Sequence, residues 1–349
     1  MRRPKTRLHS VIAAIPIVLA ATAAAQTNIN GTMQHGGMTR TFIVHLPPGF
    51  SAGQPKPLVV ALHPKGTSGA QFQSTAGWDD VSNQNGLVVV YPDGGLPAGT
   101  NGGYAWNAWD FTGGSPDDIG FLSTLIARVQ ALYGVDRCRT YMTGFSSGAM
   151  MTNTFASAHA DQVAAIAPVS GGWITAYGGS ESQLMPSVPV PVWTWRGSDE
   201  TFVTGEGSSS QPRDQQDQEQ LAYWIGHDQA TYQSTTVEQL TYQVPRIYVT
   251  RIYAGAAPVR FTEVQGTGHI YQPGAADLVW NRFFSQIVSQ SHGCGSCPTD
   301  IDRSGATDGA DLGRLLSAWG TDDPAADLNG DGIVSGADLG ILLAAWGPC

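Results

Sequence analysis

The sequence predicts an α/β fold, with helices on both faces of a mostly parallel sheet, followed by a small all-α domain. Short β-branched runs alternate with helical patterns from residue 40 to residue 291, and this alternation is typical of a parallel sheet with helical crossovers. A duplicated acidic segment follows, beginning at Asp300. The apolar content of 42% over 349 residues favours two domains with real cores and excludes a disordered chain.

The first 25 residues predict an export signal. Four basic residues lie within the first seven positions, and the apolar run Val11–Ala23 follows them. Three alanines end at Ala25 and supply the small residues that a signal peptidase requires, so we expect cleavage before Gln26. Because the apolar run is too short to cross a bilayer, we expect a secreted protein without a transmembrane segment. The net charge of −10 argues against nucleic acid as a partner.

Periodicity predicts the individual elements of the sheet domain. Runs rich in β-branched residues predict the strands Arg40–His45, Leu58–His63, Leu87–Tyr91, Thr140–Thr143, Val163–Val169, Val190–Trp195, Arg246–Tyr253 and Val259–Val264. Apolar residues at helical spacing predict the helices Asp117–Tyr133, Ser146–His159, Gln218–Gly226 and Ala275–Ser291. Ser115 and Pro116 have the residue types of an N-cap and a first helical position. The segments Gly178–Pro189 and Gly205–Arg213, rich in Gly, Ser and Pro, predict loops.

A nucleophile motif lies between a predicted strand and a predicted helix. Residues 144–148 read Gly-Phe-Ser-Ser-Gly and match the pattern G-x-S-x-G. The two glycines allow a strained turn that exposes the hydroxyl of Ser146 above the sheet. The N–H of Ser147, at the start of the helix, is then available to an oxyanion. The sequence therefore predicts Ser146 as a nucleophile and the Ser147 amide as an oxyanion donor.

A serine nucleophile needs an imidazole base, and His269 is the histidine in the right place. It follows the predicted strand Val259–Val264 through a short Gly-rich loop, which places it at the carboxyl edge of the sheet. This gives the chain order Ser, acid, His of α/β-hydrolases. The acid is expected after the strand Val190–Trp195, where Asp199 and Glu200 are adjacent. Spacing alone does not choose between these two carboxylates.

Several further motifs resemble secreted polyhydroxybutyrate depolymerases and feruloyl esterases of carbohydrate esterase family 1. They are Pro57–His63, Gly77-Trp78, Val88–Pro92, Pro116–Phe121, Val135-Asp136, Tyr141–Met150 and Gly268-His269. The resemblance implies an α/β-hydrolase fold with a Ser-His-Asp/Glu triad and no metal in the active site. The family's acid motif, His-Gly-Thr-x-Asp, falls on Arg196–Glu200 and favours Glu200, although a shift of one residue restores Asp199.

The same resemblance implies the oxyanion and substrate residues. The family's oxyanion loop usually reads His-Gly-Cys or His-Gly-Gly, whereas here it is His63-Pro64-Lys65-Gly66. Since proline has no N–H, the amides of Lys65 and Ser147 are expected to form the oxyanion hole. Trp106 is expected in the substrate pocket, because family members carry a similar Trp-Asn pair. The other aromatic residues considered for this pocket are Trp78, Tyr104 and Trp109.

The acidic tail contains a repeat with a period of 27 residues, which predicts two calcium sites. Oxygen-bearing side chains fall at loop positions 1, 3, 5, 9 and 12, a glycine lies at position 6, and position 7 offers its backbone carbonyl. The expected ligands are Asp300, Asp302, Ser304, Ala306, Asp308 and Asp311 in the first loop, and Asp327, Asn329, Asp331, Ile333, Ser335 and Asp338 in the second.

The tail resembles a type I dockerin, whose duplicated loop–helix units bind two structural Ca²⁺ ions and dock onto cohesin domains. This resemblance implies a cohesin-type scaffold protein as a partner. Positions 10 and 11 of each loop, where dockerins often carry hydroxyl residues, are Gly-Ala in both repeats. The identity of such a partner therefore stays open.

Four cysteines in an exported protein predict disulfides. Cys297 and Cys349 bracket the dockerin-like repeat, so we expect a bridge that joins its ends. Cys138 precedes the nucleophile strand, at the edge opposite the active site. Cys294 follows the last predicted helix, which returns to that same edge, so we expect a second bridge between Cys138 and Cys294.

Together these features predict a signal peptide at 1–25, an α/β-hydrolase domain at 26–293 and a dockerin-like domain at 294–349. The expected function is a secreted serine esterase that hydrolyses feruloyl or acetyl esters of plant polysaccharide, tethered by its tail. One alternative is a depolymerase of polyhydroxyalkanoate or polyhydroxybutyrate. Another is a non-catalytic secreted binding or adhesion protein that uses the hydrolase domain as a scaffold.

Overall fold

The computed structural model describes most of the chain. The described residues are 25–51, 55–98, 103–108, 116–172, 185–200, 213–289, 297–302, 306–321, 323, 326–329 and 331–348. Among them, no helix has the length and apolar character needed to cross a membrane. The expected signal peptide and most of the two expected loops, 178–189 and 205–213, lie outside the described residues.

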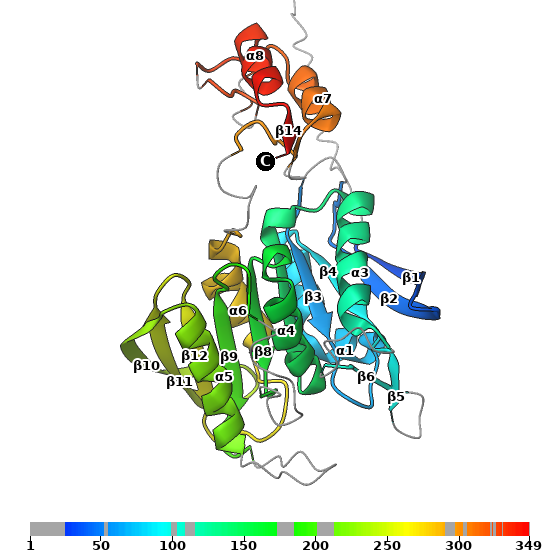
Figure 1. Ribbon diagram of the computed structural model, residues 1–349. Coiled ribbons are helices and arrows are strands. Elements are labelled where there is room, and N and C mark those ends of the chain that lie inside the picture. Colours follow the sequence, from blue (N-terminus) through cyan, green and yellow to red (C-terminus); the bar gives the residue numbers. More distant parts are fainter. Residues whose placement is uncertain are drawn as a thin grey trace, which may run out of the picture.

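A ten-stranded sheet forms the body of the protein, in the order β1-β2-β4-β3-β7-β8-β9-β12-β11-β10 (Figure 1). The strands are β1 (Thr27–His35), β2 (Met38–Leu46), β3 (Leu58–Leu62), β4 (Val88–Pro92), β7 (Thr140–Phe145), β8 (Ala165–Val169), β9 (Val192–Gly197), β10 (Thr231–Thr241), β11 (Pro245–Ala254) and β12 (Val259–Val264). The six central strands, from β4 to β12, are parallel to one another. The outer strands β1, β2, β10 and β11 are antiparallel. The mostly parallel sheet predicted from the sequence is confirmed.

All eight predicted strands are present, but the two at the sheet's edges were missed. β1 and β10 consist largely of Thr, Asn, Gln and Ser, and most of their residues are exposed. An edge strand of this kind has no continuous apolar face, so its period-2 pattern is absent and its partner strand stabilises it instead. A small ribbon, β5 (Leu96–Ala98) and β6 (Gly103–Ala105), also forms within the segment that follows β4.

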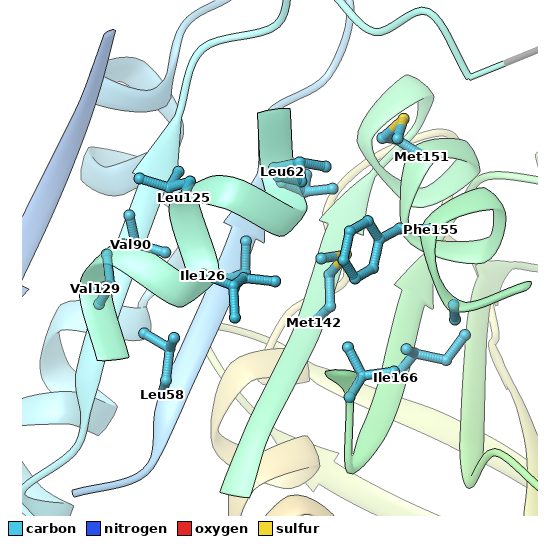
Figure 2. Close-up of a cluster of buried hydrophobic side chains, with 14 of the residues drawn as sticks. Leu58, Leu62, Val90, Leu125, Ile126, Val129, Met142, Met151, Phe155 and Ile166 are labelled. Atoms are coloured by element: carbon cyan, nitrogen blue, oxygen red, sulfur yellow. The ribbon is translucent and has the colours of Figure 1, made fainter. Parts of the chain in front are cut away.

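Helices cover both faces of the sheet, because successive residues of the central strands point to opposite sides. Val60 and Val90 pack with residues of α3 (Asp118–Tyr133), α4 (Ser147–Ala158) and α5 (Arg213–His227). Val59 and Val89 pack with residues of α1 (Gly69–Ala76), α2 (Trp78–Asn85) and α6 (Ala275–Arg282). Figure 2 shows the first of these two cores, with Leu125 and Phe155 among the helical side chains packed over the strands.

Two details of the predicted helices were wrong, and two short helices were not predicted. The N-cap of α3 is Asp117, whose carboxylate accepts the Gly120 N–H at 2.8 Å, and not Ser115. The last helix ends at Arg282 and gives way to a short 3₁₀ turn at Phe284–Gln286. The helices α1 and α2 were not predicted, because each has only eight residues and many of them are polar.

The repeat region forms one helix in each repeat, α7 (Gly309–Ser317) and α8 (Gly336–Ala344). Both helices begin with a capping box, in which Asp308 and Ser335 are the N-caps. They share a small core of their own, formed by Leu315, Ala318, Ala326, Val334 and Leu342. A short ribbon, β13 (Ala306–Thr307) with β14 (Gly347–Pro348), pairs the first repeat with the end of the second.

Candidate active site

Three of the predicted site residues meet at the carboxyl edge of the parallel strands. Ser146 follows β7, Glu200 follows β9 and His269 follows β12. Because the carboxyl ends of parallel strands lie along one edge, residues far apart in the chain come within contact distance there. The topology therefore brings together side chains that are separated by 54 residues or more.

Ser146 lies on a strained turn between β7 and α4. Its backbone has φ 53° and ψ −115°, a combination that few residues other than glycine adopt. The surrounding glycines make room for this turn. A Cβ atom on Gly148 would lie 2.2 Å from the Leu62 carbonyl oxygen, and one on Gly144 would lie 2.4 Å from the Gly148 carbonyl carbon. The close packing of β3, β7 and α4 thus requires glycine on both sides of the serine.

His269 joins the serine to a buried carboxylate. Its Nε2 lies 2.9 Å from the Ser146 Oγ, and its Nδ1 lies 2.5 Å from the Glu200 Oε1. The side chain of Glu200 is fully buried, and that of His269 is one-quarter exposed. Since the carboxylate accepts the Nδ1–H, the Nε2 is left with a lone pair that faces the serine hydroxyl.

The structure selects Glu200 rather than Asp199 as the partner of His269. The second carboxylate oxygen of Glu200 accepts the Gly197 N–H at 3.3 Å, which holds the side chain in place. Asp199 is exposed, and its carboxylate accepts a hydrogen bond from the Ser198 hydroxyl at 2.7 Å. The two carboxylates therefore have different surroundings, a difference that the spacing of the sequence did not resolve.

The loop that carries His269 is held by its own side chains. Gln272 is buried, its Oε1 accepts from the Thr267 hydroxyl at 2.7 Å, and its Nε2 donates to the carbonyl oxygens of Gly268 and Ile270. The ring of Phe145 packs against the imidazole with a centroid separation of 5.0 Å. No sequence pattern indicated Gln272, because its role depends on how the loop folds back on itself.

The predicted oxyanion loop has a fixed peptide group between Pro64 and Lys65. The Pro64 carbonyl oxygen is hydrogen-bonded by the His63 Nδ1 at 2.9 Å, the Thr67 hydroxyl at 2.9 Å and the Thr67 N–H at 3.3 Å. In a trans peptide the N–H points opposite to the C=O, so these bonds also fix the direction of the Lys65 N–H. Among the hydrogen bonds of the described residues, neither this N–H nor that of Ser147 has a protein acceptor.

His63 is neutral in this arrangement. It is fully buried, and its Nε2 accepts the Gly94 N–H at 3.0 Å, so the proton lies on Nδ1 and faces the Pro64 carbonyl. Burial lowers the pKa of the imidazole, since the charged form loses its hydration, and the nearby Arg40 lowers the pKa further; the hydrogen bond to Pro64 and the charge of Asp93 oppose this in part.

A buried ion pair holds the segment 93–95, which includes the Gly94 N–H that bonds to His63. Arg40 donates to the Asp118 carboxylate at 2.5 Å and to the Asp93 carbonyl at 2.9 Å. The same Asp118 carboxylate accepts the N–H groups of Gly95 and Asn107. Arg40 and Asp118 were not predicted as site residues, although Asp118 belongs to the Pro116–Phe121 motif on which the family resemblance rests.

The structure gives Trp106 a different place from the one expected. Its side chain is fully buried, and its indole N–H donates to the His63 carbonyl at 2.9 Å. It therefore supports the predicted oxyanion loop and offers no exposed surface to a substrate in this structure. Trp78 is also fully buried, in the core between the sheet and α6. Tyr104 is partly exposed, and Trp109 lies outside the described residues.

Three of the predicted calcium ligands of the first loop lie together. The carboxylate oxygens of Asp300, Asp302 and Asp311 lie within 4.8 Å of one another, and hard oxygen donors of this kind fit Ca²⁺. Asp308 caps α7, and Ala306 begins β13. Ser304 lies outside the described residues.

The second loop is closed by hydrogen bonds among its predicted ligands. The Asp327 carboxylate accepts the Asp331 and Gly332 N–H groups, and the Asp338 carboxylate accepts the Asn329 and Ser335 N–H groups. Ile333, whose carbonyl was expected to serve as a ligand, is half-exposed, and its N–H donates to the Asp331 carboxylate.

Two of the four cysteines lie within the described residues. Cys138 and Cys297 are both disulfide-bonded. Cys294 and Cys349 lie outside the described residues, so the pairing of the bridges stays a prediction.

The sheet topology and the chain order Ser146, Glu200, His269 are those of the α/β-hydrolase fold. The sheet and the strained turn at Ser146 together define this fold class. Comparison with known proteins agrees. Residues 40–187 match the family described as esterase PHB depolymerase. The solved structure of an acetyl xylan esterase from Aspergillus awamori superposes with a TM-score of 0.52 at 20% identity, over 74% of this chain and 99% of that one, which shows the shared fold.

Three curated relatives have similar sequences. A bifunctional acetylxylan esterase/xylanase of Neocallimastix patriciarum is 30% identical over 190 residues, which are 54% of this chain and 26% of that protein. A poly(3-hydroxyalkanoate) depolymerase of Paucimonas lemoignei is 31% identical, over 47% of this chain and 39% of the other. A feruloyl esterase of Talaromyces funiculosus is 31% identical, over 45% of this chain and 42% of the other. The chain thus spans less than half the length of each of these relatives.

Proposed function

We propose that this protein is a carboxylic ester hydrolase in which Ser146 is the nucleophile, His269 the base and Glu200 the acid. The observation that carries the proposal is the continuous hydrogen-bonded chain from the Ser146 hydroxyl through the imidazole to a fully buried carboxylate. A serine on a strained turn whose hydroxyl faces a neutral imidazole nitrogen is arranged for nucleophilic attack on a carbonyl carbon.

The reaction proceeds in two steps. His269 takes the hydroxyl proton as Ser146 attacks the ester carbonyl, and the buried Glu200 stabilises the imidazolium that forms. The Lys65 and Ser147 N–H groups donate hydrogen bonds to the negatively charged oxygen of the tetrahedral intermediate. The alcohol leaves with the proton from His269, and an acyl-serine remains. Water, deprotonated by His269, then attacks the acyl-serine carbonyl. The bond from this carbonyl carbon to the Ser146 Oγ breaks, the Oγ takes the proton from His269, and the carboxylic acid is released.

We propose feruloyl or acetyl esters of plant polysaccharide as the substrates. Two of the three relatives described above are named for acetylxylan or feruloyl esters, and the dockerin-like tail is typical of enzymes that act on plant cell walls. The second candidate is a polyhydroxyalkanoate depolymerase, which the matched family and one relative favour. The third, a non-catalytic binding protein, has no physical need for the Ser146–His269–Glu200 chain.

Turnover of p-nitrophenyl acetate by the wild type and by Ser146→Ala tests the enzyme proposal. Ser146→Ala is expected to lose all but a trace of activity while keeping the wild-type unfolding temperature. Equal turnover in both proteins, or none in the wild type, would refute the proposal. Methyl ferulate and acetylated xylan, compared with hydroxybutyrate oligomers, then decide the substrate class. Preference for the oligomers would overturn the polysaccharide assignment in favour of the depolymerase.

We further propose that the two loops of the tail bind structural Ca²⁺ and that the exported protein docks through its tail onto a cohesin-type partner. The clustered carboxylates of Asp300, Asp302 and Asp311 support the calcium proposal, because like charges held this close favour a bound cation. Calorimetric titration of the full chain with Ca²⁺ is the test, with the double variant Asp300→Ala/Asp302→Ala as its control. Two binding events are expected in the wild type and one in the variant. No binding to the wild type would refute the proposal.

A further inference from the structure

The hydroxyl of Ser147 is buried and has no hydrogen-bond partner among the described residues. The residue is 7% exposed. Its situation contrasts with that of the other three hydroxyl residues of α4. Thr152 donates to the Gly148 carbonyl at 2.9 Å, Thr154 to the Ala108 carbonyl at 2.8 Å and Ser157 to the Asn153 carbonyl at 2.9 Å. The helix therefore satisfies every hydroxyl that it buries except the one beside the nucleophile.

An unpaired buried hydroxyl destabilises the folded protein, because it has lost its bonds to water and gained none in return. An alanine at position 147 would fill the same space without this loss. A serine that costs stability in the free protein and lies next to Ser146 suggests a bond that forms only when another molecule is present.

Covalent geometry places this hydroxyl beside the predicted oxyanion donor. In any staggered rotamer, a serine Oγ lies about 3 to 4 Å from its own backbone nitrogen. The Ser147 N–H is the first of α4, at the positive end of a helix of 12 residues. An oxygen atom held by this N–H is therefore close enough to accept a bond from the hydroxyl of the same residue. A hydroxyl donates through a rotatable O–H, so it can turn toward a charge that develops during the reaction.

We propose that the Ser147 hydroxyl is a third oxyanion donor, acting beside the N–H groups of Lys65 and Ser147. The inference rests on the esterase function proposed above and adds a catalytic residue to it. The hydroxyl donates one hydrogen bond to the negatively charged oxygen of the tetrahedral intermediate and transfers no proton. Because the ground-state carbonyl oxygen is neutral, the bond strengthens as charge develops, so it raises kcat more than it lowers KM.

Ser147→Ala tests the inference by predicting opposite changes in activity and stability. The kcat for p-nitrophenyl acetate is expected to fall about 100-fold, a typical loss for one oxyanion donor, with KM changed less than about 2-fold. The unfolding temperature is expected to stay level or rise. The matched control is Ser157→Ala on the same helix, which removes a satisfied hydroxyl. It is expected to lower the unfolding temperature and leave kcat unchanged.

The pair Ser147→Thr and Ser147→Val isolates the hydroxyl, since the two side chains have the same shape. The threonine variant is expected to keep at least 10-fold more kcat than the valine variant. Equal kcat in this pair, or full kcat in Ser147→Ala, would overturn the inference. So would a loss of kcat in Ser147→Ala that comes with a lower unfolding temperature, because that result indicates a structural role. Failure of the esterase proposal itself is recognised separately, by undiminished turnover in Ser146→Ala.

Discussion

Replacing Glu200 with glutamine tests the proposed relay most directly. The amide has the shape of the carboxylate, and its oxygen can still accept the Gly197 N–H that now bonds to Glu200. Its NH₂ group, placed 2.5 Å from the His269 Nδ1 where the carboxylate oxygen now lies, can only donate. His269 is then forced to carry its proton on Nε2, which points an N–H instead of a lone pair at the Ser146 hydroxyl.

This change removes both the base and the charge that stabilises the imidazolium. A carboxylate-to-amide change at this position of a Ser-His-acid triad costs about 10⁴ in kcat, or about 5.5 kcal/mol of transition-state stabilisation at 1.36 kcal/mol per factor of ten. Full burial of the Glu200 side chain places this site at the upper end of such effects, because no water can take over the role of the carboxylate. We therefore expect kcat for p-nitrophenyl acetate to fall about 10⁴-fold while the unfolding temperature changes little.

The neighbouring Asp199→Asn is the matched control. Asp199 is exposed, and its carboxylate bonds to Ser198 and not to His269, so kcat is expected to stay within about 2-fold of the wild type. Steady-state kinetics of the two variants side by side give the answer. The reasoning is refuted if Glu200→Gln keeps more than a tenth of the activity, or if Asp199→Asn loses as much as Glu200→Gln.

Three further predictions concern the packing around the strained turn at Ser146 and around the predicted oxyanion loop. Thr67→Val removes one of the bonds to the Pro64 carbonyl and is expected to lower kcat about 5-fold, the equivalent of about 1 kcal/mol, whereas Thr67→Ser keeps the bond and the rate. Gly148→Ala places a Cβ 2.2 Å from the Leu62 carbonyl oxygen and is expected to lower the free energy of unfolding by about 3 kcal/mol or more in urea denaturation. The buried, neutral His63 has a lowered pKa, so the folded state binds fewer protons than the unfolded state, and the free energy of unfolding should fall as pH drops below about 6.5. A smaller fall in His63→Gln would support this assignment, and an unchanged pH dependence would contradict it.

Gly226→Ala provides the comparison for the glycine prediction. Gly226 lies in α5, and no heavy atom of the described residues lies within 4 Å of a Cβ built there. Alanine is the better helix former by about 1 kcal/mol, so this variant is expected to be as stable as the wild type or more stable. Loss of stability in Gly226→Ala equal to that in Gly148→Ala would show that the close approach to Leu62 is not the cause.

The sequence predicted the parts of the site that depend on local geometry. The G-x-S-x-G pattern predicted the turn at Ser146. Its glycines are needed because α4 and β3 approach too closely at this turn to leave room for a Cβ atom. The eight predicted strands were found because each has β-branched or aromatic residues that are buried or half-buried on at least one face. The edge strands β1 and β10 were not predicted, because their exposed polar residues form no such pattern.

Other assignments needed contacts between distant parts of the chain. Trp106 was predicted in the substrate pocket, yet it bonds to the His63 carbonyl, 43 positions earlier in the sequence. The roles of Arg40 and Asp118 rest on a bond across 78 positions. No periodicity or spacing predicts such pairs, since they depend on which strands, helices and loops meet in the folded chain.

By itself, then, the sequence determined the fold class and the places of Ser146 and His269 at the edge of the sheet, because periodicity, glycine spacing and chain order are local or topological properties. The family resemblance favoured Glu200 over Asp199, but only the tertiary structure showed Glu200 bonded to His269. It also revealed that the hydroxyl of Ser147 has no partner among the described residues. Adjacent residues of one chain differ in which way they face, and that direction is set by the turn after β9 and by its contact with the Thr267 carbonyl, 68 positions away from Asp199. The physical reason is that side-chain orientation at the edge of a sheet is decided by loops packing on one another, after the strands have fixed their order.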